Sequence, residues 1–165
     1  MFNDKFFTDL KNKASGKKAE NQKFFSRIPA KKYKVLDDTI SRIHNDVFKE
    51  INCLECANCC KTISPILYES DISRICKQLK TSTYEFKEKY VILDEDGDYV
   101  FKEQPCPFLG NDNFCIVYNN RPKACREYPH TNQNRFYQVI NKTILNTSVC
   151  PAVYEIVERL KKYQL

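Results

Sequence analysis

The chain has 165 residues, of which 27 are Lys or Arg and 21 are Asp or Glu, and it contains nine cysteines, three glycines and no tryptophan. This length is enough for one ordinary domain and too short for two sizeable ones. Because 42 % of the residues are hydrophobic and 13 % are aromatic, the composition excludes global disorder.

The excess positive charge lies at the N-terminal end of the chain. Residues 1–34 contain ten Lys or Arg and three acidic residues, whereas residues 35–165 are close to neutral. Such a segment attracts nucleic acid, anionic lipid or an acidic partner, although charged runs most often face water. We therefore expect any acidic protein or nucleic-acid partner to bind through residues 1–34.

The first thirteen residues, MFNDKFFTDLKNK, contain no secretory signal, because acids and lysines interrupt every apolar run. No other stretch approaches the ~20 apolar residues of a membrane span. We therefore expect a cytoplasmic protein. A reducing compartment disfavours disulfides, so clustered cysteines there indicate metal ligands.

The first fifty residues predict helices. An apolar stripe over residues 2–10 begins a first helix, Ser15-Gly16 predicts a break, and Pro29 ends the short element that follows. Apolar residues then recur every three or four positions from residue 30 to 51, which is the strongest helical pattern in the chain. We expect residues 1–52 to form a basic helical segment that packs on the same domain as the remaining chain.

The middle of the chain alternates irregular and regular segments. Residues 53–66 show no period and predict a loop, whereas helices are expected near Ser70 and after Ser82, where Glu85 completes a capping box. A β-hairpin is expected next, with strands at 91–93 and 98–101 and a turn around Asp96-Gly97.

The C-terminal third predicts two helices and an ambiguous run. The first is a short helix in RPKACREY, the run covers residues 135–145, and a terminal helix begins at Pro151. The sequence thus predicts a mainly α fold, or α+β with one small β-hairpin. In this fold N-terminal helices precede a loop-rich, cysteine-cluster metal-binding domain over residues 53–165.

Four cysteines lie within eight residues, in the run CLECANCC that begins at Cys53. Each C-x-x-C step lets a tight turn direct two thiolates at one ion. The adjacent residues Cys59 and Cys60 point their side chains apart in either a helix or a strand. The pair therefore predicts ligands that diverge toward two sites, or one ligand beside a supporting thiol.

The other cysteines are dispersed. Cys76 shares an apolar helical stripe with Ile72 and Ile75, so it is expected to be a core residue. The remaining eight cysteines equal the ligand count of two closed Cys₄ zinc sites. The triplet that begins the run, combined with a distant Cys-Pro, is equally similar to the spacing that holds a [4Fe–4S] cluster, and spacing alone does not choose between zinc and iron.

Four motifs in a fixed order resemble the YkgJ-type cysteine-cluster proteins, a family of zinc- or iron-chelating domains. The motifs are CLECANCC, PCPFL, CIVYNNRPKACREYP and a final cysteine before a helix, and together they span residues 53–150. Flagellin lysine N-methylases carry a related pattern on much longer chains. The resemblance implies a metal-binding domain without an assigned reaction, with ligands at Cys53, Cys56, Cys59, Cys60, Cys106, Cys115, Cys125 and Cys150.

Three functional hypotheses follow. The first is a metal-binding protein in which clustered thiolates hold zinc or iron for a structural or metal-handling role, with Arg121 and Arg126 offsetting the thiolate charge. The second is an iron–sulfur protein whose [4Fe–4S] cluster has a redox or radical-supporting role. The third is a nucleic-acid- or ribosome-associated module that uses the basic N-terminal segment.

Overall fold

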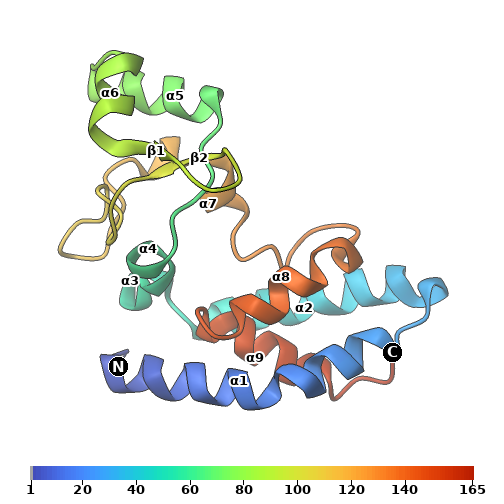
Figure 1. Cartoon of the computed structure of the whole chain (residues 1–165). Coiled ribbons are helices and arrows are strands. Elements are labelled where there is room, and N and C mark those ends of the chain that lie inside the picture. The colour runs from blue at the N-terminus through green and yellow to red at the C-terminus, as the bar shows by residue number, and fades with distance from the viewer. Residues whose placement is uncertain (1) are drawn as a thin grey trace. The chain divides into compact units, whose positions relative to one another are not determined.

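The computed structural model describes residues 2–165 and is mainly α-helical, with one two-stranded antiparallel hairpin (Figure 1). The predicted fold class is confirmed. Contacts divide the chain into a helical unit, made of residues up to Glu55 together with Pro129–Leu165, and a cysteine unit, Cys56–Tyr128. The prediction that residues 53–165 fold as one domain stays a prediction, because contacts do not report which segments fold together.

The helical unit contains the long helices α1 and α2 and the C-terminal helices α8 and α9. Within residues 2–165, none of the helices combines the length and the apolar character needed to cross a bilayer. The elements are α1 (Asp4–Ser26), η1 (Ala30–Lys32), α2 (Tyr33–Glu50), α3 (Cys53–Cys56, which crosses the boundary between the units), η3 (Phe136–Val139), α8 (Ile140–Asn146) and α9 (Pro151–Leu160).

Helix α1 runs without interruption through Ser15-Gly16, so the predicted break is wrong. The side chain of Asn3 caps its start by accepting a hydrogen bond from the Phe6 N–H. Its buried residues Leu10, Ala14, Asn21 and Phe25 recur at helical spacing on both sides of Gly16. A glycine inside a helix costs only about 1 kcal/mol, and burial of this continuous stripe offsets that cost.

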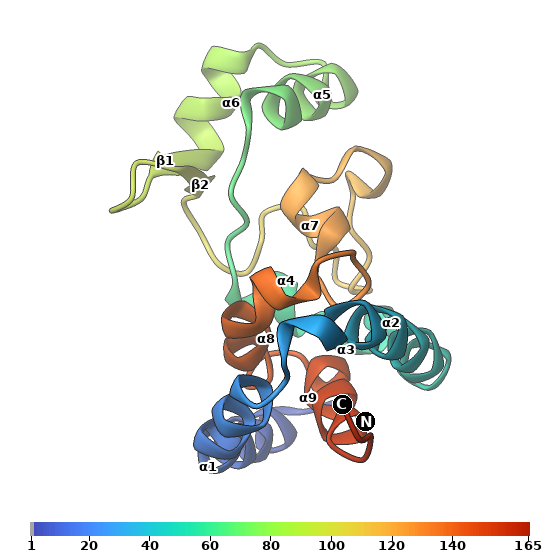
Figure 2. The same ribbon diagram turned by 90° about the vertical axis from the view of Figure 1, so that its right-hand side faces the viewer.

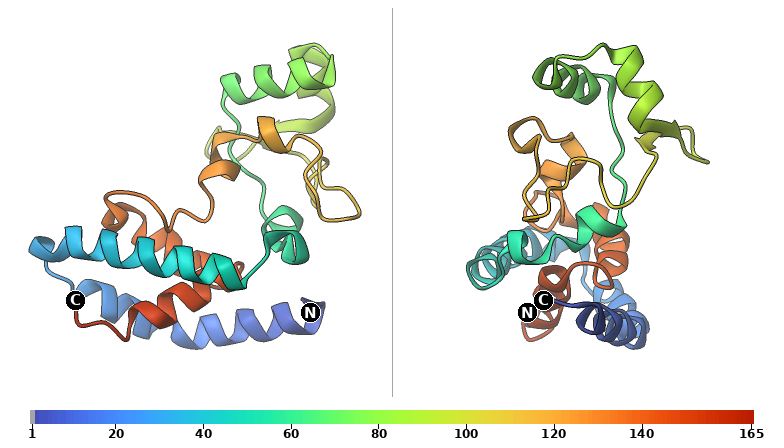
Figure 3. Two further views of the ribbon diagram at one scale, coloured as in Figure 1. Left: turned by 180° about the vertical axis from the view of Figure 1, so that it is seen from behind. Right: turned by 90° about the vertical axis from the view of Figure 1, so that its left-hand side faces the viewer.

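The core of the helical unit lies mainly between α2 and α9. These helices lie side by side, as Figure 3 shows from behind, and Figure 2 looks nearly along α1 and α2. Their inward faces bury Leu36, Ile40 and Val47 from α2, and Val153 and Ile156 from α9. The apolar residues that recur every three or four positions, and that predict α2, thus form the buried face of this helix.

Replacing Ile40 by alanine is expected to lower the free energy of unfolding by about 2–5 kcal/mol, because its side chain is fully buried and its removal leaves a cavity. The matched control is Val35→Ala in the same helix, since Val35 is 51 % exposed and its truncation is expected to cost less than about 0.5 kcal/mol. Urea unfolding measures both values, and equal losses would contradict the assigned face.

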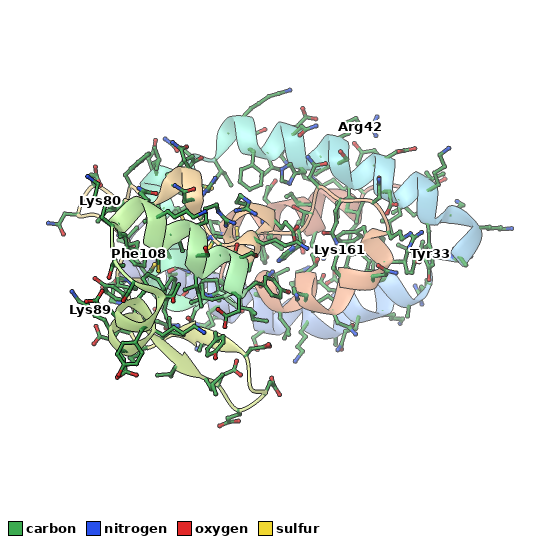
Figure 4. All side chains as sticks on the ribbon, turned by 90° about the horizontal axis from the view of Figure 1, so that it is seen from above. Tyr33, Arg42, Lys80, Lys89, Phe108 and Lys161 are labelled. Atoms are coloured by element: carbon green, nitrogen blue, oxygen red, sulfur yellow. The ribbon has the colours of Figure 1, made fainter. Side chains whose placement is uncertain are left out.

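The cysteine unit is built from short elements around a small aromatic core. The ring of Phe108, labelled in Figure 4, is stacked on that of Phe86, with 6.0 Å between the ring centroids. It also contacts the rings of Tyr90 and Phe101. Cys76 is buried in the same core, as predicted. The elements are α4 (Asn58–Thr62), α5 (Glu69–Leu79), α6 (Thr83–Tyr90), β1 (Val91–Leu93), β2 (Tyr99–Phe101), η2 (Tyr118–Asn120) and α7 (Lys123–Glu127).

The capping box and the β-hairpin predicted for this unit are confirmed. Ser82 and Glu85 form the predicted capping box, in which the Glu85 N–H donates to the Ser82 hydroxyl at 3.1 Å and the Ser82 N–H donates to the Glu85 carboxylate at 3.0 Å. The hairpin pairs Val91 with Phe101, and the Asp94 carboxylate accepts two backbone hydrogen bonds within its turn.

The predicted loop over residues 53–66 is partly wrong, because α3 and α4 occupy nine of its first ten residues. Ala57 separates them in the left-handed conformation, with φ of 47°. Helices of four and five residues are too short to display an apolar period, so periodicity could not reveal them.

Candidate metal centre

Four thiols of the cysteine unit lie close enough for their charges to interact. Cys60 in α4 interacts with Cys106, Cys115 and Cys125, which come from the loop after the hairpin, the following turn and α7. Cys106 also interacts with Cys115, and Cys125 interacts with all three other thiols. We call these four residues the Cys60 tetrad.

Backbone hydrogen bonds hold three members of the tetrad together. The Cys106 N–H donates to the Cys60 carbonyl at 2.8 Å. Leu109 and Cys115 form an isolated antiparallel bridge, closed by a turn in which the Gly110 N–H donates to the Phe114 carbonyl at 2.8 Å. A Cβ at Gly110 would lie 2.7 Å from the Asp112 carboxylate and 3.2 Å from that carbonyl, so the turn favours glycine.

Backbone amides also donate to three of the sulfurs. In each case the donor lies two residues after the cysteine, at Asn58 for Cys56, Phe108 for Cys106 and Val117 for Cys115. Each hydrogen bond lowers the pKa of its thiol, because it stabilises the thiolate. The thiolate is the form that binds metal, so these turns favour ligation.

Burial opposes ionisation and has the largest effect on the pKa of each of these three thiols and of Cys125. It raises the pKa of Cys106 to about 11 and that of Cys125 to about 12, and the neighbouring thiolates of the tetrad raise both values further. The pKa of Cys60 is instead lowered to about 7, first by a hydrogen bond with Cys59 and then by the charges of Arg121 and Lys61. A bound cation offsets repulsion of this kind and favours the thiolates.

Arg121 supplies positive charge to the tetrad, as expected for a residue that offsets thiolates. Its charge lowers the pKa values of Cys60, Cys115 and Cys125. The guanidinium carbon lies 3.7 Å from the centroid of the Tyr118 ring, and Nε donates to the Tyr118 carbonyl at 2.9 Å. These contacts hold the guanidinium in place.

The vicinal cysteines do not diverge as far as their spacing suggests. The sulfurs of Cys59 and Cys60 lie 3.9 Å apart. Two thiolates on one tetrahedral zinc ion, each with a Zn–S distance of about 2.3 Å, are separated by about 3.8 Å. This separation fits two thiolates on one ion, and the hydrogen bond between the sulfurs equally fits one ligand beside a supporting thiol, so the roles of the pair stay a prediction.

The other predicted ligands are distributed over both units. Cys56 is buried, and its thiol interacts with the charge of Cys60. Cys53 lies in α3, and Cys150 is the N-cap of α9 and packs against the helical core. Across residues 2–165, no three His, Cys, Asp or Glu side chains are gathered as a group that could hold a metal ion. The assignment of eight ligands thus stays a prediction.

The sequence did not reveal one buried polar contact beside the tetrad. The Asp71 carboxylate accepts hydrogen bonds from the Arg74 guanidinium at 2.6 Å and from the Lys123 N–H at 3.1 Å. The sequence places Asp71 only within the helix predicted near Ser70. Its second partner is 52 residues away, and no local pattern in the sequence signals that contact.

A family model described as "Putative zinc- or iron-chelating domain", CxxCxxCC, matches residues 52–151. The match covers more than half of the chain and includes all eight cysteines of the predicted ligand set. No curated protein and no solved structure matches the chain. The chain belongs to the CxxCxxCC family of zinc- or iron-chelating domains.

Proposed function

We propose that the cysteine unit binds a zinc or iron ion through Cys60, Cys106, Cys115 and Cys125, and that the ion stabilises the fold of this unit. The proposal is supported by the charge interactions among these four thiols, which come from four separate segments, and by the hydrogen bond from the Cys106 N–H to the Cys60 carbonyl. Because no three such side chains of residues 2–165 are gathered as a metal site, we expect the ion to draw these thiols together. Four thiolates complete a tetrahedral shell and leave no position for a water ligand, so such a site is structural.

Membership of the chelating family supports metal binding in general. The closer resemblance to YkgJ-type proteins stays a prediction, as do the ligand roles of Cys53, Cys56, Cys59 and Cys150.

A [4Fe–4S] cluster is the second candidate. The observation that favours it is the set of backbone N–H donors to the sulfurs of Cys56, Cys106 and Cys115. Hydrogen bonds to ligand sulfurs are one of the factors that set the potential of iron–sulfur clusters. The same bonds also suit a zinc tetrathiolate, so the contents of the purified protein must decide.

We expect the full chain, purified anaerobically without added metal, to contain at least about one equivalent of zinc plus iron. Metal analysis, sulfide determination and visible absorption are performed on the same sample. Colourless protein with zinc and no sulfide supports the structural zinc site, whereas stoichiometric iron and sulfide support the cluster. A sample with far less than one equivalent of both metals would overturn the proposal of a resident metal.

The role of the basic segment as a binding surface stays a prediction. Part of its charge is already paired, because Lys17 lies 2.9 Å from the Glu20 carboxylate, which also binds Lys161, the C-cap of α9. In η1, the side chain of Lys31 is exposed and that of Lys32 is half-buried.

A further inference from the structure

One buried carboxylate serves the N-termini of two helices in the cysteine unit. The Asp71 side chain is 2 % exposed and belongs to the first turn of α5, where it accepts a hydrogen bond from the Tyr68 N–H at 3.2 Å. Its other oxygen accepts the hydrogen bond from the Lys123 N–H, at the start of α7. A carboxylate is favourable at both places, because N-terminal amides lack partners and the helix dipole is positive there.

Arg74 extends this contact to Arg121, two residues before α7. Its Nη2 atom donates to the Asp71 carboxylate at 2.6 Å and to the Arg121 carbonyl at 2.8 Å. Arg126 donates to the same carbonyl at 2.5 Å. The planar guanidinium of Arg74 therefore joins α5 to the segment that begins at Arg121, with a geometry that lysine cannot reproduce.

These contacts reach the start of helix α7. It has only five residues, and its N-cap, Pro122, provides no side-chain hydrogen bond. The helix carries Cys125, and Arg121, which interacts with three thiols of the tetrad, lies just before it. Asp71 and Arg74 thus act on two members of the candidate metal centre at once.

We infer that Asp71 and Arg74 are positioning residues for metal binding, which orient Cys125 and Arg121 toward the rest of the Cys60 tetrad. This inference rests on the proposed function. Residues that orient metal ligands commonly contribute 10–100-fold to metal affinity. The pair should therefore affect both the affinity and the geometry of the bound ion.

The test compares Asp71→Asn, Asp71→Ala and Arg74→Lys with the core variant Phe86→Leu, all in the full chain. Phe86 is buried in the same unit but makes none of these polar contacts. Zinc affinity is measured by competition with a chromophoric chelator, stability by urea unfolding, and coordination by the absorption of bound Co²⁺. The sulfur-to-cobalt bands report the number of thiolate ligands, and the ligand-field bands report tetrahedral geometry.

We expect Asp71→Asn and Arg74→Lys to weaken zinc binding by about 10–100-fold, and Asp71→Ala to weaken it further and to reduce the sulfur-to-cobalt bands as Cys125 leaves the ion. Phe86→Leu should lower stability without changing the spectrum of the loaded protein. If Asp71→Ala does not fold, Asp71→Asn and Arg74→Lys still provide the test.

Two results would overturn the inference. One is wild-type affinity and spectrum in Asp71→Asn and Arg74→Lys, and the other is an equal spectral change in Phe86→Leu. Failure of the proposed function is distinguishable, because the wild-type chain itself would then bind neither Zn²⁺ nor Co²⁺ stoichiometrically.

Discussion

Cys60→Ser is expected to abolish stoichiometric metal binding, with a loss of affinity greater than about 100-fold, because removal of a ligand should exceed the cost of losing an outer-shell partner. Cys60 interacts with every other member of the tetrad and with Cys56, so its loss removes the thiol that they share. A serine hydroxyl does not ionise as a thiol does, so the variant cannot supply the missing thiolate. Metal analysis of the purified variant and zinc competition measure the effect.

Cys76→Ala is the matched control, because it also removes a thiol from the cysteine unit. Cys76 is 4 % exposed, packs in the aromatic core and donates from Sγ to the Ser82 carbonyl at 3.8 Å. Its truncation is expected to cost at most a few kcal/mol of stability while metal content stays at the wild-type level. Equal metal content in the two variants would show that the tetrad does not hold the ion.

Much of the secondary structure could be predicted because its causes are local. Helix α2 displays its buried face as a sequence period, and the capping box of Ser82 and Glu85 marks the start of α6 within four residues. The prediction failed at Ser15-Gly16, because a turn signal is a weak preference and burial along α1 outweighs it. It also failed in residues 53–66, where the helices are too short for a period.

The candidate site could be predicted only as a set of cysteines, not as a grouping. Sequence spacing favours partners within CLECANCC, whereas Cys60 interacts with Cys106, Cys115 and Cys125, which lie 46 or more positions further along the chain. Hydrogen bonds across the turn at Gly110 and between α5 and α7 join these distant segments. Contacts at such separations leave no periodic signal, so the buried role of Asp71 was also missed.

Removing the metal from the wild-type chain with a strong chelator should open the cysteine unit selectively. The buried core of this unit has nine residues against thirteen in the helical unit, and its helices α4 and α7 have only five residues each. Short helices are marginal without tertiary support, and structural zinc contributes about 10–16 kcal/mol in the small peptides that depend on it. Amide hydrogen exchange is expected to show a loss of protection across residues 56–128, while α2 and α9 keep their protection. Addition of zinc should restore the lost protection.

Chelator-treated Cys60→Ser is the control, because its exchange should already match that of the metal-free protein. Uniform loss of protection in both units would show that they unfold as one, and unchanged exchange after verified metal removal would show that the ion does not stabilise the fold.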